Sequence, residues 1–261
     1  MRYEVGALRK SALMLRVLAE SEDALGVSEL ARRAGIAKNM AYRILMTLAE
    51  LGWVQQEGDG GGFRLTLVPF RLFARPLERA TLTTACHQPL RWLQRETGET
   101  AYVSVLDGLR AVNVQVIEGG RDIRVSGRVG SAFDLHCTAQ GKVLLAAGGD
   151  DLLRRVEAAG LTRRTRATIT AGKRLAQHLE RVRQEGFAIN DEEFAPGLVG
   201  CAAPIIDTRR TVVAAIGIFA ATIAVDAERL RRTLAPLVRK AAEWTSLNLG
   251  APGGDVDGVR P

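Results

Sequence analysis

The chain has 261 residues, of which 47% are hydrophobic and 25% charged, and its net charge is +7 at pH 7. This length suits two globular domains, and this composition supports a full core, which excludes a disordered chain. The longest apolar run, residues 212–225, is too short to cross a bilayer, and the N-terminus lacks the apolar core of a signal peptide. We therefore expect a cytoplasmic protein without a membrane partner.

The three cysteines and the positive charge bear on the compartment and the partner. Cys86, Cys137 and Cys201 lie far apart and form no C-x-x-C pair, which favours a reducing compartment over a disulfide framework or structural zinc. The net charge permits an anionic partner. Most of the positive surplus lies outside the first 80 residues, however, so charge alone does not establish DNA binding.

Residues 1–67 have the pattern of three helices followed by a hairpin. Ser28 before an acidic turn predicts the start of the second helix, and Gly35 predicts its end. Two short strands, at residues 53–56 and 63–67, flank a glycine-rich turn. This order predicts a winged helix-turn-helix domain, which binds DNA or, as an alternative, acts as a protein-binding adaptor.

The third helix carries side chains that can read DNA. One face, with Ala41, Ile44 and Leu48, is apolar, and the opposite face is polar. Arginine can pair with guanine and asparagine with adenine, whereas lysine and threonine suit phosphates. The predicted DNA-binding residues are Lys38, Asn39, Met40, Tyr42, Arg43, Thr47 and, in the wing, Arg64.

The remainder of the chain alternates strands and helices. We predict a linker helix at 68–83 that Pro76 kinks, a domain at 84–249, and a disordered tail at 250–261. Expected strands are 101–106, 111–117, 123–126, 187–190, 201–207 and 212–219. Expected helices are 86–97, 138–148, 150–159, 172–185 and 226–249. The fold class is therefore α+β.

Two segments together resemble one family. Residues 34–48, followed by Gly52-Trp53-Val54, resemble the N-terminal signature of IclR-type transcription regulators. The chain keeps the family's Lys38 and Arg43, but it departs at Asn39 and Met40, so its operator sequence cannot be taken from relatives. Residues 135–146, with Leu-His-Cys-Thr-Ala-Gln-Gly-Lys, resemble a segment of the family's effector domain.

This resemblance extends over residues 8–249 and implies a GAF/PAS-like antiparallel sheet with an effector cavity, in a homodimer or homotetramer. The start of the helix after Thr138 suits a carboxylate, because its N–H groups and dipole are positive. The resemblance places these residues near the effector: Ile123, Ala139, Gln140, Asn190, Leu198, Gly200, Cys201, Gly217 and Phe219. Family members often carry an acid at position 190 and small hydroxyl residues near 217 and 219, so this cavity is expected to accept a bulkier, aromatic acid.

We thus predict a transcription regulator that binds double-stranded operator DNA under control of a small organic or aromatic acid, with no enzymatic activity, metal or cofactor. Each effector residue could instead be ordinary core. A hydrolase or transferase using Cys137 or Cys201, or a metal site using His136, Cys201 and an acid of 191–193, are the alternatives. His136 and Cys137 are neighbours that would face opposite sides of a strand, which argues against a catalytic pair.

Overall fold

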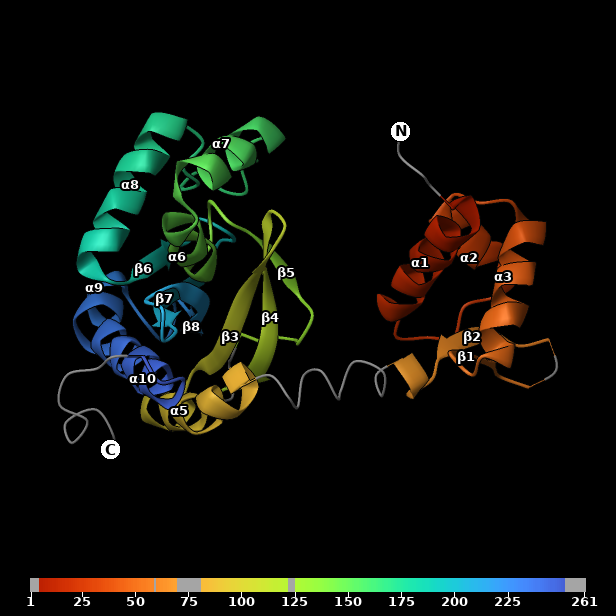
Figure 1. The fold of residues 1–261 in the computed structure, drawn as a ribbon, viewed down its shortest axis with the longest axis horizontal. Coiled ribbons are helices and arrows are strands. Elements are labelled where there is room, and N and C mark those ends of the chain that lie inside the picture. The colour runs from red at the N-terminus through yellow and green to blue at the C-terminus, as the bar shows by residue number, and fades with distance from the viewer. Residues whose placement is uncertain (1–4, 59, 70–80, 122–124, 252–261) are drawn as a thin grey trace. The chain divides into compact units, whose positions relative to one another are not determined.

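The computed structural model describes residues 5–58, 60–69, 81–121 and 125–251 (Figure 1). Contacts divide the chain into two compact units, Met1–Arg79 and Ala80–Pro261. Most of the predicted linker helix, including Pro76, and nearly all of the predicted tail lie outside the described residues. Within the described ranges, no helix is long and apolar enough to cross a membrane.

The first unit is the predicted winged helix-turn-helix. Its elements are α1 (Gly6–Ala19), α2 (Val27–Ala34), α3 (Lys38–Glu50), β1 (Val54–Gln56) and β2 (Phe63–Leu65). The two strands pair antiparallel, with Gln55 opposite Arg64. Met14, Leu30, Leu45 and Phe63 are almost fully buried, so the three helices and the hairpin share one core.

The turn between α2 and α3 matches the prediction at its glycine but not at its start. Gly35 ends α2 with a φ of 65°, a left-handed conformation that glycine adopts without strain. Gly26, not Ser28, is the N-cap of α2. The carbonyl of Gly26 already accepts the N–H of Leu30 at 3.0 Å, which puts Ser28 inside the first turn.

The second unit is built on a six-stranded sheet in the order β5-β4-β3-β8-β7-β6, in which every neighbouring pair is antiparallel. The strands are β3 (Thr100–Asp107), β4 (Arg110–Ile117), β5 (Ala132–Asp134), β6 (Ala188–Asp191), β7 (Leu198–Ile206) and β8 (Val212–Ala221). The prediction of an antiparallel sheet with packed helices is thereby confirmed.

The strand predicted at residues 123–126 is wrong at residues 125 and 126. Positions 123 and 124 lie outside the described residues, and Val125 and Ser126 are not in a strand. The Val125 carbonyl accepts the hydroxyl of Thr100 at 2.5 Å, a side-chain hydrogen bond that takes the place of a ladder bond. The strand that pairs with β4 at this edge is β5 instead.

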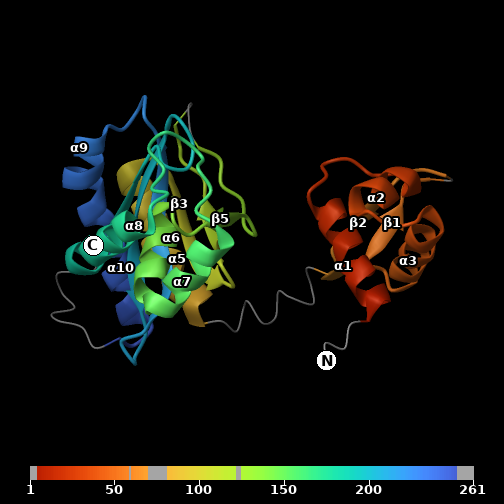
Figure 2. The same ribbon diagram turned by 90° about the horizontal axis from the view of Figure 1, so that it is seen from above.

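Helices cover both faces of the sheet (Figures 1 and 2). On one face lie α5 (Thr81–Thr97) and α10 (Ala235–Asn248), and on the other lie α6 (Ala139–Ala147), α7 (Gly149–Ala159) and α8 (Gly172–Glu185). Successive strand residues point to opposite faces, so each strand supplies both cores.

The last predicted helix, 226–249, has a π-helical interruption. It consists of α9 (Ala227–Arg229), η1 (Leu230–Leu234) and α10. Asp226 caps its start by accepting the N–H of Arg229 at 2.7 Å. Pro236 in the first turn of α10 has no N–H, so it cannot continue an α-helical ladder, and the wider turn precedes it.

Candidate DNA-reading surface and effector site

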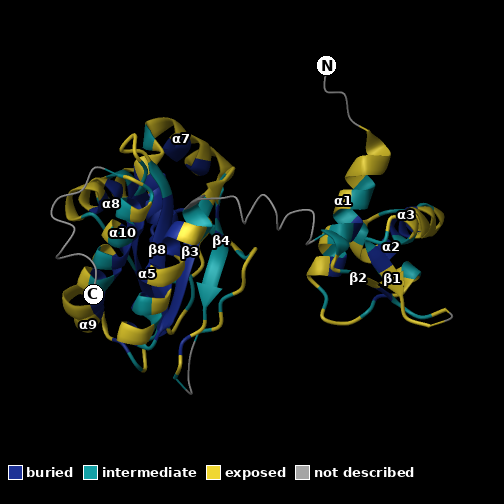
Figure 3. Cartoon of the chain, turned by 60° about the horizontal axis from the view of Figure 1, so that its bottom comes forward, coloured by how far each residue is buried: buried dark blue, intermediate teal, exposed yellow. Residues whose placement is uncertain are grey.

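The α3 helix buries one face and exposes the other. Ala41, Ile44, Leu45 and Leu48 are buried in the core of the first unit. The exposed residues of its other face, which we term the DNA-reading stripe, are Lys38, Asn39, Tyr42, Arg43, Met46 and Thr47. Figure 3 shows this exposure along α3. The stripe repeats at helical spacing, which is the arrangement that a helix entering the major groove requires.

The start of α3 adds backbone donors to the DNA-reading stripe. Ala37 is the N-cap and provides no side-chain hydrogen bond. The first intrahelical hydrogen bond runs from the N–H of Ala41 to the carbonyl of Ala37 at 3.0 Å. The N–H groups of Lys38 and Asn39 precede that bond and can therefore donate to a phosphate.

Two of the predicted DNA-binding residues are less available for contact with DNA than the others. Met40 is half-buried and packs against the core of the first unit. Thr47 is exposed, but its hydroxyl donates to the carbonyl of Arg43 at 3.0 Å. Its single proton is therefore used inside the helix, and Thr47 can donate to a phosphate only if this bond breaks.

Further cations lie on the wing and on α2. Arg64 on β2 is exposed and pairs with Glu57 across the wing at 3.1 Å. On α2, Arg32 and Arg33 each approach the carboxylate of Glu29 to 2.6 Å. The hydrogen bonds from these two arginines lower the pKa of Glu29 to about 2. The two arginines were not among the predicted DNA-binding residues, although their spacing from Glu29 on a helix identifies the cluster.

In the second unit, the start of α6 lies against the centre of the sheet. Thr138 caps α6, as predicted, by accepting the N–H of Gly141 at 3.2 Å. The first intrahelical hydrogen bond runs from the N–H of Lys142 to the carbonyl of Thr138. The N–H groups of Ala139 and Gln140 precede it and can therefore donate to an anion.

An aromatic stack fills the space beside Gln140. The hydroxyl of Tyr102 on β3 donates to Oε1 of Gln140 at 2.9 Å. The ring of Tyr102 stacks on Phe219 of β8, with centroids 4.1 Å apart and ring planes 25° apart. Gly217 admits this ring, because a Cβ there would lie 2.6 Å from the Tyr102 hydroxyl. The predicted residues Gln140, Gly217 and Phe219 therefore surround Tyr102.

Tyr102 was not among the predicted effector residues. It pairs with Gly217 across β3 and β8, and the absent side chain of the glycine leaves room for the ring. A tyrosine opposite a glycine on neighbouring strands is a signal, but the pairing register is not visible in the sequence. The amide nitrogen Nε2 of Gln140 is buried and has no hydrogen-bond partner among the described residues.

The other predicted effector residues fall into three positions. Ala139 and Leu198 pack in the same core as Phe219, and Gly200 pairs directly with Phe219. Asn190 uses its amide within the chain: Oδ1 accepts the N–H of Glu193 at 2.9 Å, and Nδ2 donates to a backbone carbonyl. Ile123 lies outside the described residues.

The structure places Cys201 in a different core from Ala139, Leu198 and Phe219. Its side chain is fully buried in the core between the sheet and the helices α5 and α10. Strand alternation explains this position, because Ala202 next to it packs on the α6 side. Burial raises the pKa of the Cys201 thiol. Cys201 therefore lies on the opposite side of the sheet from Gln140.

The alternatives that used a cysteine or a metal gain no support. Burial, aided by Asp134, raises the pKa of Cys137 to about 12, so the thiol stays protonated and weakly nucleophilic at neutral pH. Nε2 of His136 lies 3.0 Å from the carbonyl of Thr162. Across the described residues, no three His, Cys, Asp or Glu side chains form a group that could hold a metal ion.

A buried ion pair joins α6 to the segment at residues 189–193. Lys142 on α6 is fully buried, and its Nζ donates to the carboxylate of Glu193 and, at 2.5 Å, to the carbonyl of Ile189. Burial lowers the pKa of Lys142, and the charge of Glu193 opposes that shift. The pair fastens the 189–193 segment to α6, and sequence analysis did not find it.

Comparison with known proteins identifies two domains. Residues 7–58 match the model of the IclR helix-turn-helix domain, and residues 74–247 match that of the bacterial transcriptional regulator IclR C-terminal domain. The HTH-type transcriptional regulator KdgR of Escherichia coli (strain K12) is 33% identical over 247 residues, which cover 94% of this chain and 93% of KdgR.

Solved structures are similar along nearly the whole chain. The IclR protein of Thermotoga maritima is 26% identical with a TM-score of 0.76, and the match covers 95% of this chain and 100% of that one. An IclR homologue from Microbacterium hydrocarbonoxydans, solved in complex with 4-hydroxybenzoate, is 20% identical with a TM-score of 0.81. The match covers 95% of this chain and 100% of the homologue.

Proposed function

The chain belongs to the IclR family, whose members are DNA-binding transcription regulators, and from this premise we propose how its residues divide the work. The DNA-reading stripe of α3 contacts base edges in the major groove. The residues around Tyr102 and the start of α6 bind a small effector. The observation that carries the first assignment is the polar, exposed face of α3 opposite its buried face.

Within the stripe, Arg43 and Asn39 carry the base selectivity. The guanidinium of arginine can donate two hydrogen bonds to guanine, and the amide of asparagine can pair with adenine at two points. Lys38 and the wing residue Arg64 contact phosphates and fix the position of the helix. The Arg64–Glu57 pair is exposed, so exchanging Glu57 for a phosphate costs little.

Binding to DNA from the protein's own promoter tests the DNA assignment. In the double variant Asn39→Ala/Arg43→Ala, we expect specific binding to fall to the level of unrelated DNA, while weak binding at low salt persists. The control is Arg154→Ala, which removes an exposed arginine from α7 of the second unit. Specific binding that survives in the double variant would exclude α3 as the reading helix.

The effector is a small aromatic acid. The support is the buried Nε2 of Gln140, which has no partner among the described residues and lies beside the stacked rings of Tyr102 and Phe219. An entering ring can take the place of one stacked side chain, and its carboxylate can accept from Gln140 and from the N–H groups at the start of α6. The 4-hydroxybenzoate complex of the Microbacterium homologue supports this class of ligand.

Calorimetry with 4-hydroxybenzoate tests the effector assignment. We expect saturable binding that Gln140→Leu weakens and that Cys201→Ser leaves unchanged, because Cys201 lies across the sheet. Equal affinity in the Gln140 variant would exclude the α6 site. Binding of benzoate itself at similar strength would show that the ring and carboxylate suffice.

Effector control of DNA binding requires two copies of the first unit that bind the operator together. We propose that the protein acts in the cytoplasm as a homodimer or homotetramer. In each copy, we propose a DNA-binding domain at 1–67, a linker helix at 68–83, an effector domain at 84–249 and a tail at 250–261. The effector then changes the spacing of two first units, because half-site spacing depends on how a dimer holds its reading helices. Operator affinity that is the same with and without saturating 4-hydroxybenzoate, despite binding, would exclude this ligand as the effector.

A further inference from the structure

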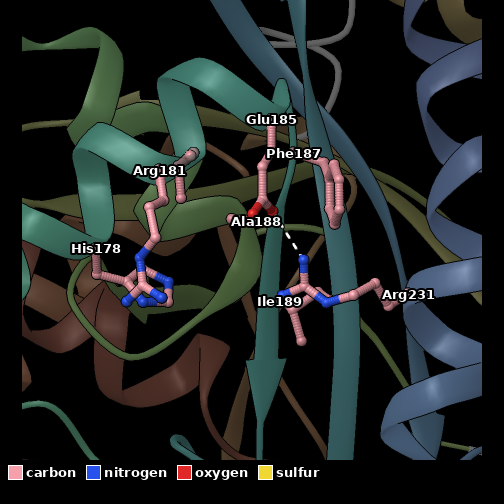
Figure 4. Close-up of a pocket in the computed structure, with 8 residues that line it drawn as sticks. His178, Arg181, Glu185, Phe187, Ala188, Ile189 and Arg231 are labelled. Carbon is pink, nitrogen blue, oxygen red and sulfur yellow. Dashed lines mark hydrogen bonds and ion pairs between the residues drawn. The ribbon is translucent and has the colours of Figure 1, made fainter.

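A crevice in the second unit lies apart from the proposed effector site. It opens between α8, β6 and η1, has about 30 Å³ of space that the centre of a water-sized sphere can occupy, and shares no lining residue with the predicted effector set. Its main lining residues are His178, Arg181, Glu185, Phe187, Ile189 and Arg231. Figure 4 shows His178 and Arg181 projecting from α8 and Arg231 reaching in from the opposite side.

The charges in this crevice do not balance. Arg231 donates to the carboxylate of Glu185 at 2.9 Å, and its guanidinium lies 5.6 Å from the ring centre of Phe187. Arg181, one helical turn before Glu185, adds a second guanidinium, so two cations face one carboxylate. The Arg231 side chain is 56% exposed, which leaves it open to a ligand from solvent.

The imidazole of His178 adds a hydrogen-bond donor that is uncharged at neutral pH. Burial is the largest cause that lowers its pKa, to about 4, and the charges of Lys142, Arg181, Arg231 and Arg174 lower it further. Lys142 is itself paired with Glu193, whereas Arg181 and Arg174 are exposed residues of α8. At neutral pH the imidazole therefore carries one N–H donor in a positive surrounding.

We propose that this crevice binds a small oxyanion, a carboxylate or a phosphate group, as a second ligand of the protein. Arg181 and Arg231 hold the charge, and His178 donates one hydrogen bond. Guanidinium groups suit these anions because their paired N–H groups match two oxygens. Phe187 and Ile189 provide an apolar wall for a small carbon body. The alternative is that Arg231 and Glu185 form only an ordinary surface ion pair, in which case the crevice binds no anion.

The imidazole of His178 reports on an anion directly. We would follow the three histidines of the full-length protein by NMR through a pH titration, adding inorganic phosphate in one series and trifluoroacetate, a carboxylate that stays charged at low pH, in another, at constant ionic strength set with chloride. A bound anion should raise the titration midpoint of His178 saturably by about one pH unit, a tenfold gain in proton affinity. His87, exposed on α5, is the internal control.

Variants separate a site from general screening. In Arg181→Gln/Arg231→Gln the midpoint starts higher, because two cations are gone, and it should no longer respond to either anion. Arg232→Gln, which removes an exposed arginine of the same η1 segment, should keep the full response. A response to phosphate alone or to trifluoroacetate alone identifies the ligand class. Equal shifts at His87, no shift beyond chloride, or a response that persists in the double variant would overturn the proposal.

Discussion

The two units hold the side chains proposed to bind DNA and effector in opposite environments. In the first unit, the DNA-reading stripe projects into solvent from a single helix, and the core beneath it is complete without it. In the second unit, Gln140, Tyr102, Gly217 and Phe219 come from α6, β3 and β8, and all four are buried. Operator specificity can therefore change without touching the fold, whereas effector specificity and the stability of the second unit are coupled.

One ion pair from each unit illustrates the same contrast. Glu29 is bound by two arginines that remain largely in water, and exposed pairs contribute little to stability. Lys142 and Glu193 are both buried, so each is the other's ion-pair partner in a place that water does not reach. The four predictions below test this contrast between exposed and buried sites.

The largest effect is expected from Glu193→Leu. It leaves the charge of Lys142 buried without its carboxylate, and breaking a buried pair costs about 3–5 kcal/mol of unfolding free energy. Denaturant unfolding, followed by the fluorescence of Trp92 and Trp244 in the second unit, measures it. An exposed ion pair of the same unit, Glu228 with Arg232, offers the control. Glu228→Leu removes the partner of Arg232 and should change the free energy of unfolding by less than about 1 kcal/mol. Equal losses in both variants would contradict the contrast.

Next in size is Gly217→Ala. Its Cβ would lie 2.4 Å from the carbonyl of Cys201 and 2.6 Å from the Tyr102 hydroxyl, so the ring must move. Overpacking of this kind costs about 3 kcal/mol, and displacement of Tyr102 should also weaken effector binding. Thermal unfolding and calorimetry measure the two effects. Gly6→Ala, where a Cβ meets open space on α1, should change neither. Full stability and affinity in Gly217→Ala would mean that the stack does not need this glycine.

A smaller effect, on binding alone, is expected from Arg43→Ala. Loss of a base-reading arginine should weaken specific operator binding by about 2 kcal/mol while stability stays unchanged, because the side chain is exposed. Thr47→Val should reduce binding far less, since the hydroxyl is already bonded to the Arg43 carbonyl. Fluorescence anisotropy with promoter DNA compares the two variants. A Thr47 variant as weak as the Arg43 variant would show that this bond breaks on DNA.

The smallest effect concerns pH. The folded protein holds the pKa of His178 at about 4, below its ordinary value of 6.5, so the unfolded chain binds more protons between these two values. His178 therefore lowers stability as pH falls below 6.5, and this loss levels off near 4. His178 is partly open to solvent, so we expect the loss to reach only about 1 kcal/mol. His178→Gln should remove it, as the difference between the two unfolding curves at pH 7 and pH 5 would show.

Much of the first unit was predictable because its signals are local. The spacing of Ala41, Ile44 and Leu48 identifies both faces of α3, and Gly35 marks the turn before it. The error at Ser28 was one of position, since a cap is decided by which carbonyl closes the first turn. The Thr47–Arg43 hydrogen bond also escaped prediction, because a threonine in a helix can use its hydroxyl inwards or outwards.

In the second unit, the sequence by itself determined the strands β3, β4, β6, β7 and β8, the helices and the cap at Thr138, because periodicity and capping act within a few residues. Only the tertiary structure decided that Cys201 belongs to the other core, that Tyr102 lies over Gly217, and that Lys142 meets Glu193. Strand register and helix packing set these contacts between residues remote in the chain, and a shift of one residue would exchange the two faces. The proposed reading surface is therefore a property of one helix, and the proposed effector site is a property of the assembled sheet.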